Sequence, residues 1–262
     1  MSSSPNAPQS ILITGATGGI GGALACAYAT AGVQLFLQGR NGAKLAEVAA
    51  RCTALGATVE TAAIDVRERA QLVAWLQGVG ARVPLDLVVI CAGININIGA
   101  DGAGERWADT EALIDINITA AIATVDAVLP AMRARRQGQI ALFSSLAAYF
   151  GLPITPSYCA SKAAIKAYGE ALRGWLAPEG IRINVVMPGF VESPMCEEFP
   201  GPKPFLWPAD KAARYIQRGL AANRARISFP FPLNLGSWYL GVAPAALAQK
   251  LVSWFNFSKH RG

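Results

Sequence analysis

The chain has 262 residues, of which 53% are hydrophobic and only 15% are charged, so it can bury a substantial core within one domain. The net charge is +6, but the basic residues are scattered, which argues against nucleic-acid binding. Five cysteines without a CxxC pair, and a single histidine at position 260, argue against a metal site, a disulfide framework and Ser-His-Asp hydrolysis. We therefore expect a cytoplasmic protein.

Residues 1–9 lack the basic start and apolar core of a secretion signal and are predicted to be a disordered leader. Ser10 to Ile13 is a short apolar strand, and a turn containing Gly15, Gly19 and Gly21 follows it before an Ala-rich helix to about Ala31. Strand, glycine turn and helix form the first unit of a nucleotide-binding fold, in which the backbone approaches a pyrophosphate. This spacing differs from G-x-G-x-x-G and is weak evidence by itself.

The second predicted strand, Val33 to Leu37, ends near Gly39 and Arg40. Enzymes that select NAD usually place a carboxylate here for the ribose 2′-hydroxyl, whereas an arginine suits a 2′-phosphate. With Arg40 and no acid nearby, the sequence favours NADP(H). The alternative is that Arg40 is an ordinary surface charge.

Strands and helices continue to alternate along the next part of the chain. The predicted elements are a helix over Ala43–Leu55, a strand over Thr58–Ile64, a helix over Arg67–Gln77 and a strand over Leu85–Ile90. This alternation predicts an α/β fold: a Rossmann-like, doubly wound parallel sheet of about seven strands flanked by helices. The cofactor is expected along the carboxyl ends of the strands, where Asp65 could hold an adenine amine.

A long apolar helix is predicted over Thr110–Leu129, with Asn117 in its middle. A buried amide there needs a partner, either a backbone carbonyl freed by a local bulge or an ordered water. A structural polar group and a catalytic water-holder both remain open.

Ile140 to Phe143 is predicted as the fifth strand, and the hydroxyls of Ser144 and Ser145 follow it. A helix to about Leu176 then carries Tyr158 and Lys162, which share one face because they are four residues apart. A neighbouring ammonium favours the ionised phenol, so we expect Lys162 to lower the pKa of Tyr158 towards working range.

Arg182 to Val186 is the sixth predicted strand and runs into Pro188 and Gly189. Prolines then mark an extended apolar loop at about 193–209, which is predicted to be a substrate lid. The alternative is a loop folded onto its own core.

Together these residues resemble the short-chain dehydrogenases/reductases, over roughly Ile11 to Met195. The motifs are Thr14-Gly15-x-x-x-Gly19-Ile20-Gly21, Asp65, Ala92-Gly93, Asn117, Ser145, Tyr158-x-x-x-Lys162 and Pro188-Gly189. Their occurrence together and in this order is specific, although each motif alone is weak.

The resemblance implies a role for each matching residue. Tyr158 would be the acid/base, Ser145 would position the carbonyl oxygen, Lys162 would lower the Tyr158 pKa and hold the nicotinamide ribose, and Asn117 would hold a water. The implied cofactor-binding residues are Gly15, Thr17, Gly18, Gly19, Ile20, Arg40, Asp65, Val66, Ala92, Gly93, Tyr158, Lys162, Pro188, Gly189, Val191 and Ser193. Three departures from the family are Cys91 in place of the usual Asn, Ser193 in place of Thr, and an atypical tail.

The tail, 226–262, is predicted to be an apolar extension of the domain formed by residues 10–225. Ile227 to Gln249 contains no charged residue, but its prolines and glycines argue against a membrane-spanning helix. Ile227 to Phe229 is a candidate final strand. Pro244 to Phe257 is predicted to be an amphipathic helix with Leu247, Leu251, Trp254 and Phe255 on one side. Such a face could cover the core, a subunit partner or a bilayer surface.

The sequence therefore predicts an NADPH-dependent carbonyl reductase, reversible as an alcohol dehydrogenase, that acts on a small molecule and assembles as a homodimer or homotetramer. A second hypothesis is a reductase of a lipid-like ketone that is peripheral at the membrane surface. A third, from another class, is a non-catalytic NADP(H)-binding sensor or scaffold.

Overall fold

The computed structural model describes residues 7–99 and 102–254. In this part of the chain, seven parallel strands form one sheet in the order β3-β2-β1-β4-β5-β6-β7. The strands are β1 (Ser10–Thr14), β2 (Gln34–Gly39), β3 (Thr58–Ala63), β4 (Leu87–Ile90), β5 (Gly138–Phe143), β6 (Ile181–Pro188) and β7 (Arg226–Phe229). The predicted Rossmann-like, doubly wound sheet is confirmed.

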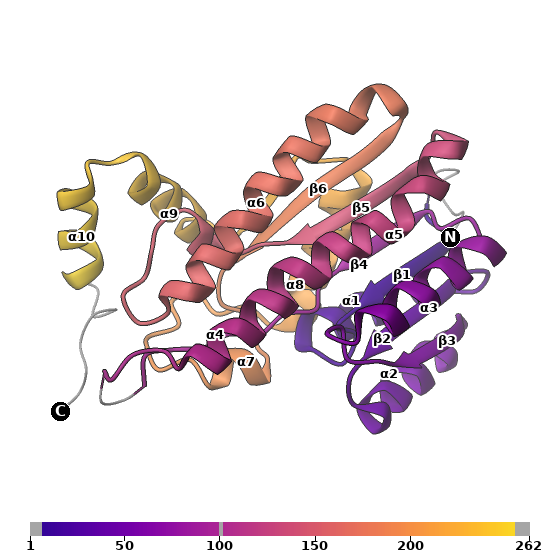
Figure 1. Ribbon diagram of the computed structural model, residues 1–262, viewed down its shortest axis with the longest axis horizontal. Helices are drawn as coiled ribbons and strands as arrows, with labels where there is room; N and C mark the ends of the chain where they lie inside the picture. Colours follow the sequence, from indigo (N-terminus) through magenta and orange to yellow (C-terminus); the bar gives the residue numbers. More distant parts are fainter. Residues whose placement is uncertain (1–6, 100–101, 255–262) are drawn as a thin grey trace.

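Helices cover both faces of the sheet (Figure 1). One face carries α1 (Gly19–Tyr28), α2 (Gly42–Ala54) and α8 (Ala209–Ala221), and the other carries α3 (Arg69–Arg82), α5 (Ala120–Arg135) and α6 (Pro156–Leu176). Successive strand side chains point to opposite faces, so Ile11 and Ile13 join one core while Leu12 joins the other. This is why the central strands are largely apolar rather than alternating.

The long helix predicted over Thr110–Leu129 is interrupted in the structure. It consists of α4 (Trp107–Ile114), a π-helical turn η1 (Asp115–Thr119) and α5. A local bulge was one of the two predicted settings for Asn117; the bulge is present, but the carbonyl that the Asn117 amide contacts is that of Ile94 in the loop after β4. Among the described residues, this stretch alone has the length and apolarity to cross a membrane. However, Val125, Val128 and Met132 pack in the second core, which lies between the sheet and the helices α3, α5 and α6. It is therefore a core helix of this fold.

The region after β6 contains two helices that the sequence reasoning did not predict. The predicted lid contains the short α7 (Pro194–Glu197), and α8 follows the lid. The buried side of α8 consists of Ala212, Ala213, Ile216 and Leu220, which pack against the same sheet face as α1. Two short 3₁₀ turns, η2 (Leu146–Ala148) and η3 (Ala177–Glu179), complete the central connections.

The C-terminal extension begins with β7, which confirms the predicted final strand. Two helices, α9 (Leu233–Val242) and α10 (Ala245–Trp254), then lie beyond the carboxyl ends of the strands (Figure 1). Helix α10 buries Ala248 and Val252, while Leu247 and Trp254 are exposed. The predicted apolar side of this helix is therefore right for Leu251, which lines a cavity, but wrong for Leu247 and Trp254, because the helix turns Ala248 and Val252 towards the protein. Phe255 lies outside the described residues.

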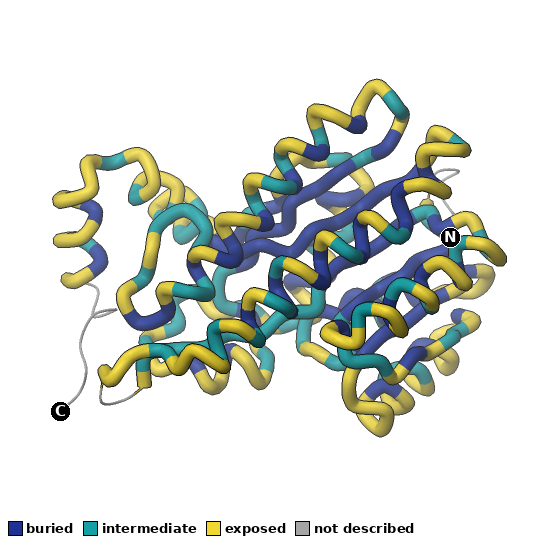
Figure 2. The backbone as a smooth tube through the Cα atoms, viewed as in Figure 1, coloured by how far each residue is buried: buried dark blue, intermediate teal, exposed yellow. Residues whose placement is uncertain are grey.

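Both ends of the chain extend past the described part. Residues 1–6 of the predicted leader lie outside it, but Gln9 belongs to the fold, since its N–H donates to Asp86 Oδ2 at 2.9 Å. Its carbonyl also accepts the N–H of Gln34 at 2.7 Å. The predicted boundary at residue 9 is therefore slightly too late. Figure 2 shows the buried strands in the centre and the mostly exposed surface of α9 and α10.

Candidate active site

The glycine turn between β1 and α1 packs closely against the segments that follow β4 and β6. Gly15 has φ +70°, and a Cβ there would lie 2.7 Å from the backbone of Ala92. A Cβ on Gly19 would lie 2.6 Å from the carbonyl oxygen of Glu192. Helix α1 begins at Gly19 without a side-chain cap, so its first N–H groups remain available to an anion. Thr17, Gly18 and Ile20 complete the turn.

Two buried polar residues hold this turn and the loop after β4 in place: Gln38, which sequence reasoning gave no role, and Thr14, which opens the glycine motif. Gln38, at the end of β2, accepts the N–H of Gly15 on its side-chain oxygen at 3.1 Å. Thr14 Oγ1 accepts the N–H of Cys91 at 3.2 Å and that of Ala92 at 3.4 Å. The signal for both was a polar side chain at the carboxyl end of an otherwise apolar strand.

Arg40 follows β2 directly and is exposed, beside the Thr17 end of the turn. A Cβ on the neighbouring Gly39 would lie 2.6 Å from the Thr17 methyl group. The glycine at this position therefore lets the turn pack closely against the end of β2. Asp65 lies at the end of the adjacent β3, where Arg67 binds its carboxylate at 2.8 Å. This ion pair lowers the pKa of Asp65, and Arg40 adds a smaller effect in the same direction. The predicted adenine-side residues thus lie together, with Asp65 already paired; Val66 is buried beneath them.

The loop after β4 is tied to the π-helical turn by Asn117. Its Oδ1 accepts the N–H of Ile94 at 2.8 Å, and its Nδ2 donates to Ile94 O at 2.9 Å and to Ser161 Oγ at 3.0 Å. Gly93 makes room for this arrangement, because a Cβ there would lie 3.1 Å from Asn117 Oδ1 and 3.3 Å from Lys162 Nζ. The amide therefore serves as a structural bridge, and its role in holding a water stays a prediction.

Ser145, Tyr158 and Lys162 meet at the carboxyl end of β5. Ser145 follows this strand, and its Oγ accepts the N–H of Ala147 at 3.1 Å and hydrogen-bonds with Tyr158. Tyr158 and Lys162 lie one turn apart on α6, with Lys162 Nζ 5.5 Å from the centre of the Tyr158 ring. The same ammonium donates to the carbonyl oxygen of Phe143 at 3.1 Å. A hydroxyl, a phenol and an ammonium therefore converge as predicted.

The electrostatics of this group differ from the sequence prediction. Burial raises the pKa of Tyr158 to about 12, and its hydrogen bond with Ser145 offsets only part of that effect. Burial also lowers the pKa of Lys162 to about 8. The predicted shift of the Tyr158 pKa towards the neutral range is wrong in this structure, because burial of the phenol outweighs the stabilisation that its neighbours give to the ionised form. The phenol is thus protonated at neutral pH and can donate.

The segment after β6 links the glycine turn to the predicted lid. Gly189 N–H donates to Phe229 O at 2.8 Å, and Val191 forms a parallel bridge with Trp207. Ser193 Oγ accepts the N–H of Cys196 at 3.2 Å and so caps α7. Pro188, Gly189, Val191 and Ser193 are therefore brought to the same edge of the sheet as the other predicted residues.

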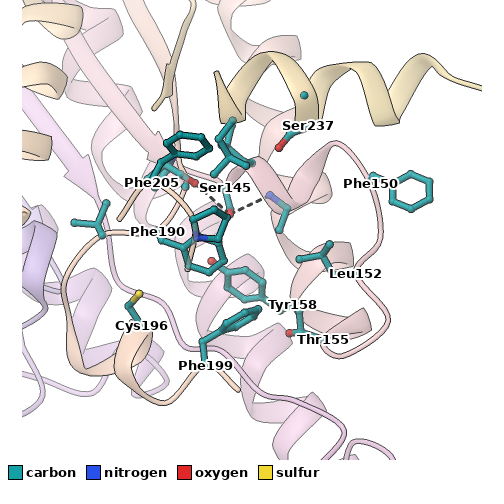
Figure 3. Close-up of a pocket in the computed structure, with 18 of the residues that line it drawn as sticks. Ser145, Phe150, Leu152, Thr155, Tyr158, Phe190, Cys196, Phe199, Phe205 and Ser237 are labelled. Carbon is teal, nitrogen blue, oxygen red and sulfur yellow. Dashed lines mark hydrogen bonds between the residues drawn. The ribbon is translucent and has the colours of Figure 1, made fainter. Parts of the chain in front are cut away.

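A cavity of about 460 Å³ opens beside Tyr158 and Ser145 (Figure 3). The predicted lid contributes Met195, Cys196, Phe199 and Phe205 to its wall. The opposite wall comes from residues that the sequence did not single out, in the loop after β5, in α9 and in α10. These include Phe150, Leu152, Leu233, Ser237, Tyr239, Leu240 and Val252. The atypical tail is thus part of the site. The sequence could not reveal this, because the tail is apolar and has no clear periodicity.

This arrangement of residues is matched by a known family. Residues 9–202 match the family model described as short chain dehydrogenase. The chain is a short-chain dehydrogenase. A relative from Myxococcus xanthus, described as an uncharacterized oxidoreductase, is 34% identical over 240 residues, covering 91% of this chain and 94% of its own. The ketoacyl reductase HetN of Nostoc is 32% identical over 184 residues, covering 70% of this chain and 63% of its own.

Solved structures agree with this assignment. A short-chain dehydrogenase from Sphingobium yanoikuyae in complex with NADPH superimposes with a TM-score of 0.79. The two chains are 24% identical, and the alignment covers 93% of this dehydrogenase and 95% of the other. This likeness shows the shared fold.

The site of this short-chain dehydrogenase fits a nicotinamide dinucleotide. Gly15 and Gly19 let the turn pack tightly against Ala92 and Glu192, where a Cβ would clash, and helix α1 begins beside this turn with uncapped backbone N–H groups that can bind a pyrophosphate. Cys91, which replaces the usual Asn, is a neutral thiol, since burial raises its pKa to about 12. Thr14 and Asn117 hold the Cys91 loop through its backbone instead.

Proposed function

We propose that this short-chain dehydrogenase is an NADP(H)-dependent carbonyl reductase that can also oxidise the corresponding secondary alcohols. The observation that carries the proposal is the convergence of Ser145, Tyr158 and Lys162 beside both the glycine turn and the apolar cavity. A reductase needs a proton donor, a group that orients the carbonyl oxygen and a fixed place for the hydride carrier. The relative named ketoacyl reductase supports carbonyl reduction.

In this mechanism, the Tyr158 hydroxyl donates its proton to the carbonyl oxygen, which the Ser145 hydroxyl binds and orients. Bound NADPH supplies the hydride. Lys162 stabilises the phenolate that remains after proton transfer, because its ammonium lies one helical turn away. The buried setting strengthens this attraction and excludes bulk water from the reacting atoms.

The choice of NADP(H) over NAD(H) rests on Arg40. It is the residue directly after β2, and the carboxylate nearby, Asp65, is neutralised by Arg67. An exposed guanidinium at this position suits the additional phosphate of NADPH, whereas a carboxylate would repel it.

The test is NADPH oxidation across a panel of aldehydes and ketones, with cofactor binding measured separately by fluorescence. Turnover of any carbonyl by the wild-type protein supports the reductase. NADPH binding without turnover anywhere in the panel would contradict it and favour the non-catalytic sensor or scaffold.

A second candidate is a reductase that acts at the membrane surface on a lipid-like ketone. The observation that favours it is α9, a helix without charged or buried residues, on which Leu235, Trp238 and Val242 are exposed. Flotation with anionic liposomes tests this candidate. Protein that stays wholly in solution would count against it.

The proposal also places the protein in the cytoplasm as a homodimer or homotetramer. All five cysteines are free thiols, which suits a reducing compartment. Trp107, Ile114 and Trp175 are large exposed apolar residues on α4 and α6, as expected of a subunit interface. Light scattering coupled to gel filtration measures the oligomeric state directly. A monomer at micromolar concentration would contradict the proposed assembly.

A further inference from the structure

The cavity beside Tyr158 has a lining without charge. Among the described residues that form its wall, none is Asp, Glu, Lys, Arg or His. The polar groups are few and neutral: Asn95, Ser145, Thr155, Tyr158, Ser193, Ser237 and Tyr239. Transfer of an ion from water into such surroundings costs several kcal/mol unless a partner charge compensates. The part of a ligand that enters this cavity is therefore neutral.

The apolar walls lie on both sides of the catalytic hydroxyls. On one side are the aromatic rings of Phe190, Phe199 and Phe205, and on the other are Phe150 and Leu152 (Figure 3). A carbonyl oxygen bound by Ser145 and Tyr158 would thus have apolar surface next to each of its two substituents. The cavity of about 460 Å³ is also lined by Pro188, Gly189 and Val191 of the expected cofactor site, so the substrate shares this volume with the nicotinamide end of the cofactor.

Helix α9 closes one end of this cavity and contains a glycine at the wall. Gly236 lines the cavity, and a Cβ built there would have no heavy atom within 4 Å. Its backbone is helical, with its N–H donating to Pro232 O at 3.1 Å. Gly236 is itself exposed, so a larger side chain at this position is compatible with the fold and would lie at the rim of the cavity wall.

We infer that the substrate is a neutral, bulky ketone with an apolar group on each side of its carbonyl, and that Gly236 on α9 determines how large one of these groups can be. This inference rests on the proposed reductase function and adds the substrate class. Gly236 acts as a specificity-determining residue through the space that it leaves.

The first part of the test compares matched ligands on the wild-type protein with NADPH. The probes are a bulky diaryl ketone, the same ketone with a carboxylate on one ring, and acetone. Both turnover and calorimetric binding are measured. We expect the carboxylate to lower affinity and kcat/KM at least about a hundredfold, the equivalent of a desolvation cost of several kcal/mol. Comparable affinity for the charged and neutral ketones would overturn the inference.

The second part uses Gly236→Phe, with Gly78→Phe as the matched control, because Gly78 is also a helical glycine with nothing within 4 Å of its Cβ. We expect Gly236→Phe to lower affinity and kcat/KM for the bulky ketone at least about tenfold more than it lowers kcat/KM for acetone. The control should affect neither. An equal effect on both ketones, or none on the bulky one, would overturn the role of Gly236.

The binding measurement separates this inference from the proposed function. Tight binding of the bulky neutral ketone without any reduction would contradict the reductase and leave the ligand class standing. Reduction of small or charged ketones, without preference for the bulky neutral one, would support the reductase and refute the ligand class.

Discussion

Tyr158 and Lys162 lie close together on α6, yet burial away from water changes the pKa of each side chain more than the neighbouring side chain does. Burial raises the pKa of the phenol above its ordinary value and lowers that of the ammonium below its ordinary value. The tyrosine therefore keeps its proton, and the lysine loses its proton more easily. The i to i+4 spacing predicted their proximity correctly. The sign of the pKa shift could not be predicted, because it depends on how deeply the surrounding fold buries both groups.

The lowered Lys162 pKa predicts a pH-dependent stability. The folded protein releases this proton near pH 8, whereas the unfolded chain keeps it until about pH 10.4, so stability rises with pH between these values. Relative to Lys162→Met, the free energy of unfolding of the wild-type protein should increase by about 2 kcal/mol from pH 7 to pH 9.5. Denaturant titrations at several pH values measure this. Parallel pH profiles for the two proteins would contradict the prediction.

Arg40 allows a prediction for the cofactor. In Arg40→Asp, the affinity for NADPH should fall by about 2 kcal/mol, or roughly thirtyfold, while the affinity for NADH changes little, because the carboxylate repels only the additional phosphate. Fluorescence titration with both cofactors measures the two constants. Arg214→Asp on the exposed side of α8 is the control for a changed net charge. An equal loss for both cofactors would show that Arg40 does not contact the 2′-phosphate.

At the scale of elements, the strands were predictable and several helices were not. The central strands are short apolar runs because both sheet faces are covered, and such runs stand out in the sequence. Helix α9 lacks a polar face and is flanked by prolines, so periodicity could not identify it. Helix α8 was missed although Ala212, Ile216 and Leu220 recur at helical spacing, because the proline-rich segment before it suggested a loop.

The π-helical turn depends on Asn117, which connects three elements through one amide. Asn117→Ala removes the three hydrogen bonds to Ile94 and Ser161 and leaves buried backbone groups without partners. We expect the free energy of unfolding to fall by about 3 kcal/mol. Thr124→Val, which removes one buried hydroxyl bonded to Ala120 O at 2.7 Å on the next helix, should cost about 1 kcal/mol. Equal losses in chemical denaturation would mean that the amide bridge contributes little.

At the scale of the whole molecule, the catalytic group, the glycine turn and the lid belong to distant parts of the chain. Parallel strands bring them together, since their carboxyl ends meet at one edge of the sheet. The sequence could therefore place the candidate site, and its motifs supplied most of the residues. It could not supply the wall formed by α9 and α10, because that wall depends on how an apolar segment without periodicity packs against η2 and the end of the sheet.

The C-terminal helices are separable from the two main cores. Neither of the two large cores contains a described residue of α9 or α10. Phe229 in β7 is the last residue in chain order that belongs to either core. A chain that ends after Pro232 should therefore keep its circular dichroism spectrum and NADPH affinity, but lose at least about tenfold in kcat/KM for a bulky ketone, because one cavity wall is gone. Loss of the folded state on truncation would contradict this division.

The central claim is that Tyr158 donates the proton to a carbonyl held beside the glycine turn. The most direct measurement is kcat/KM for NADPH-dependent ketone reduction by Tyr158→Phe, with NADPH affinity measured on the same protein. Tyr168→Phe on the same helix serves as the control, since Tyr168 packs against the second core away from the cavity. We predict that Tyr158→Phe loses about a thousandfold in kcat/KM while its NADPH affinity and the control's activity are retained. Activity in Tyr158→Phe within tenfold of the wild type would contradict the claim.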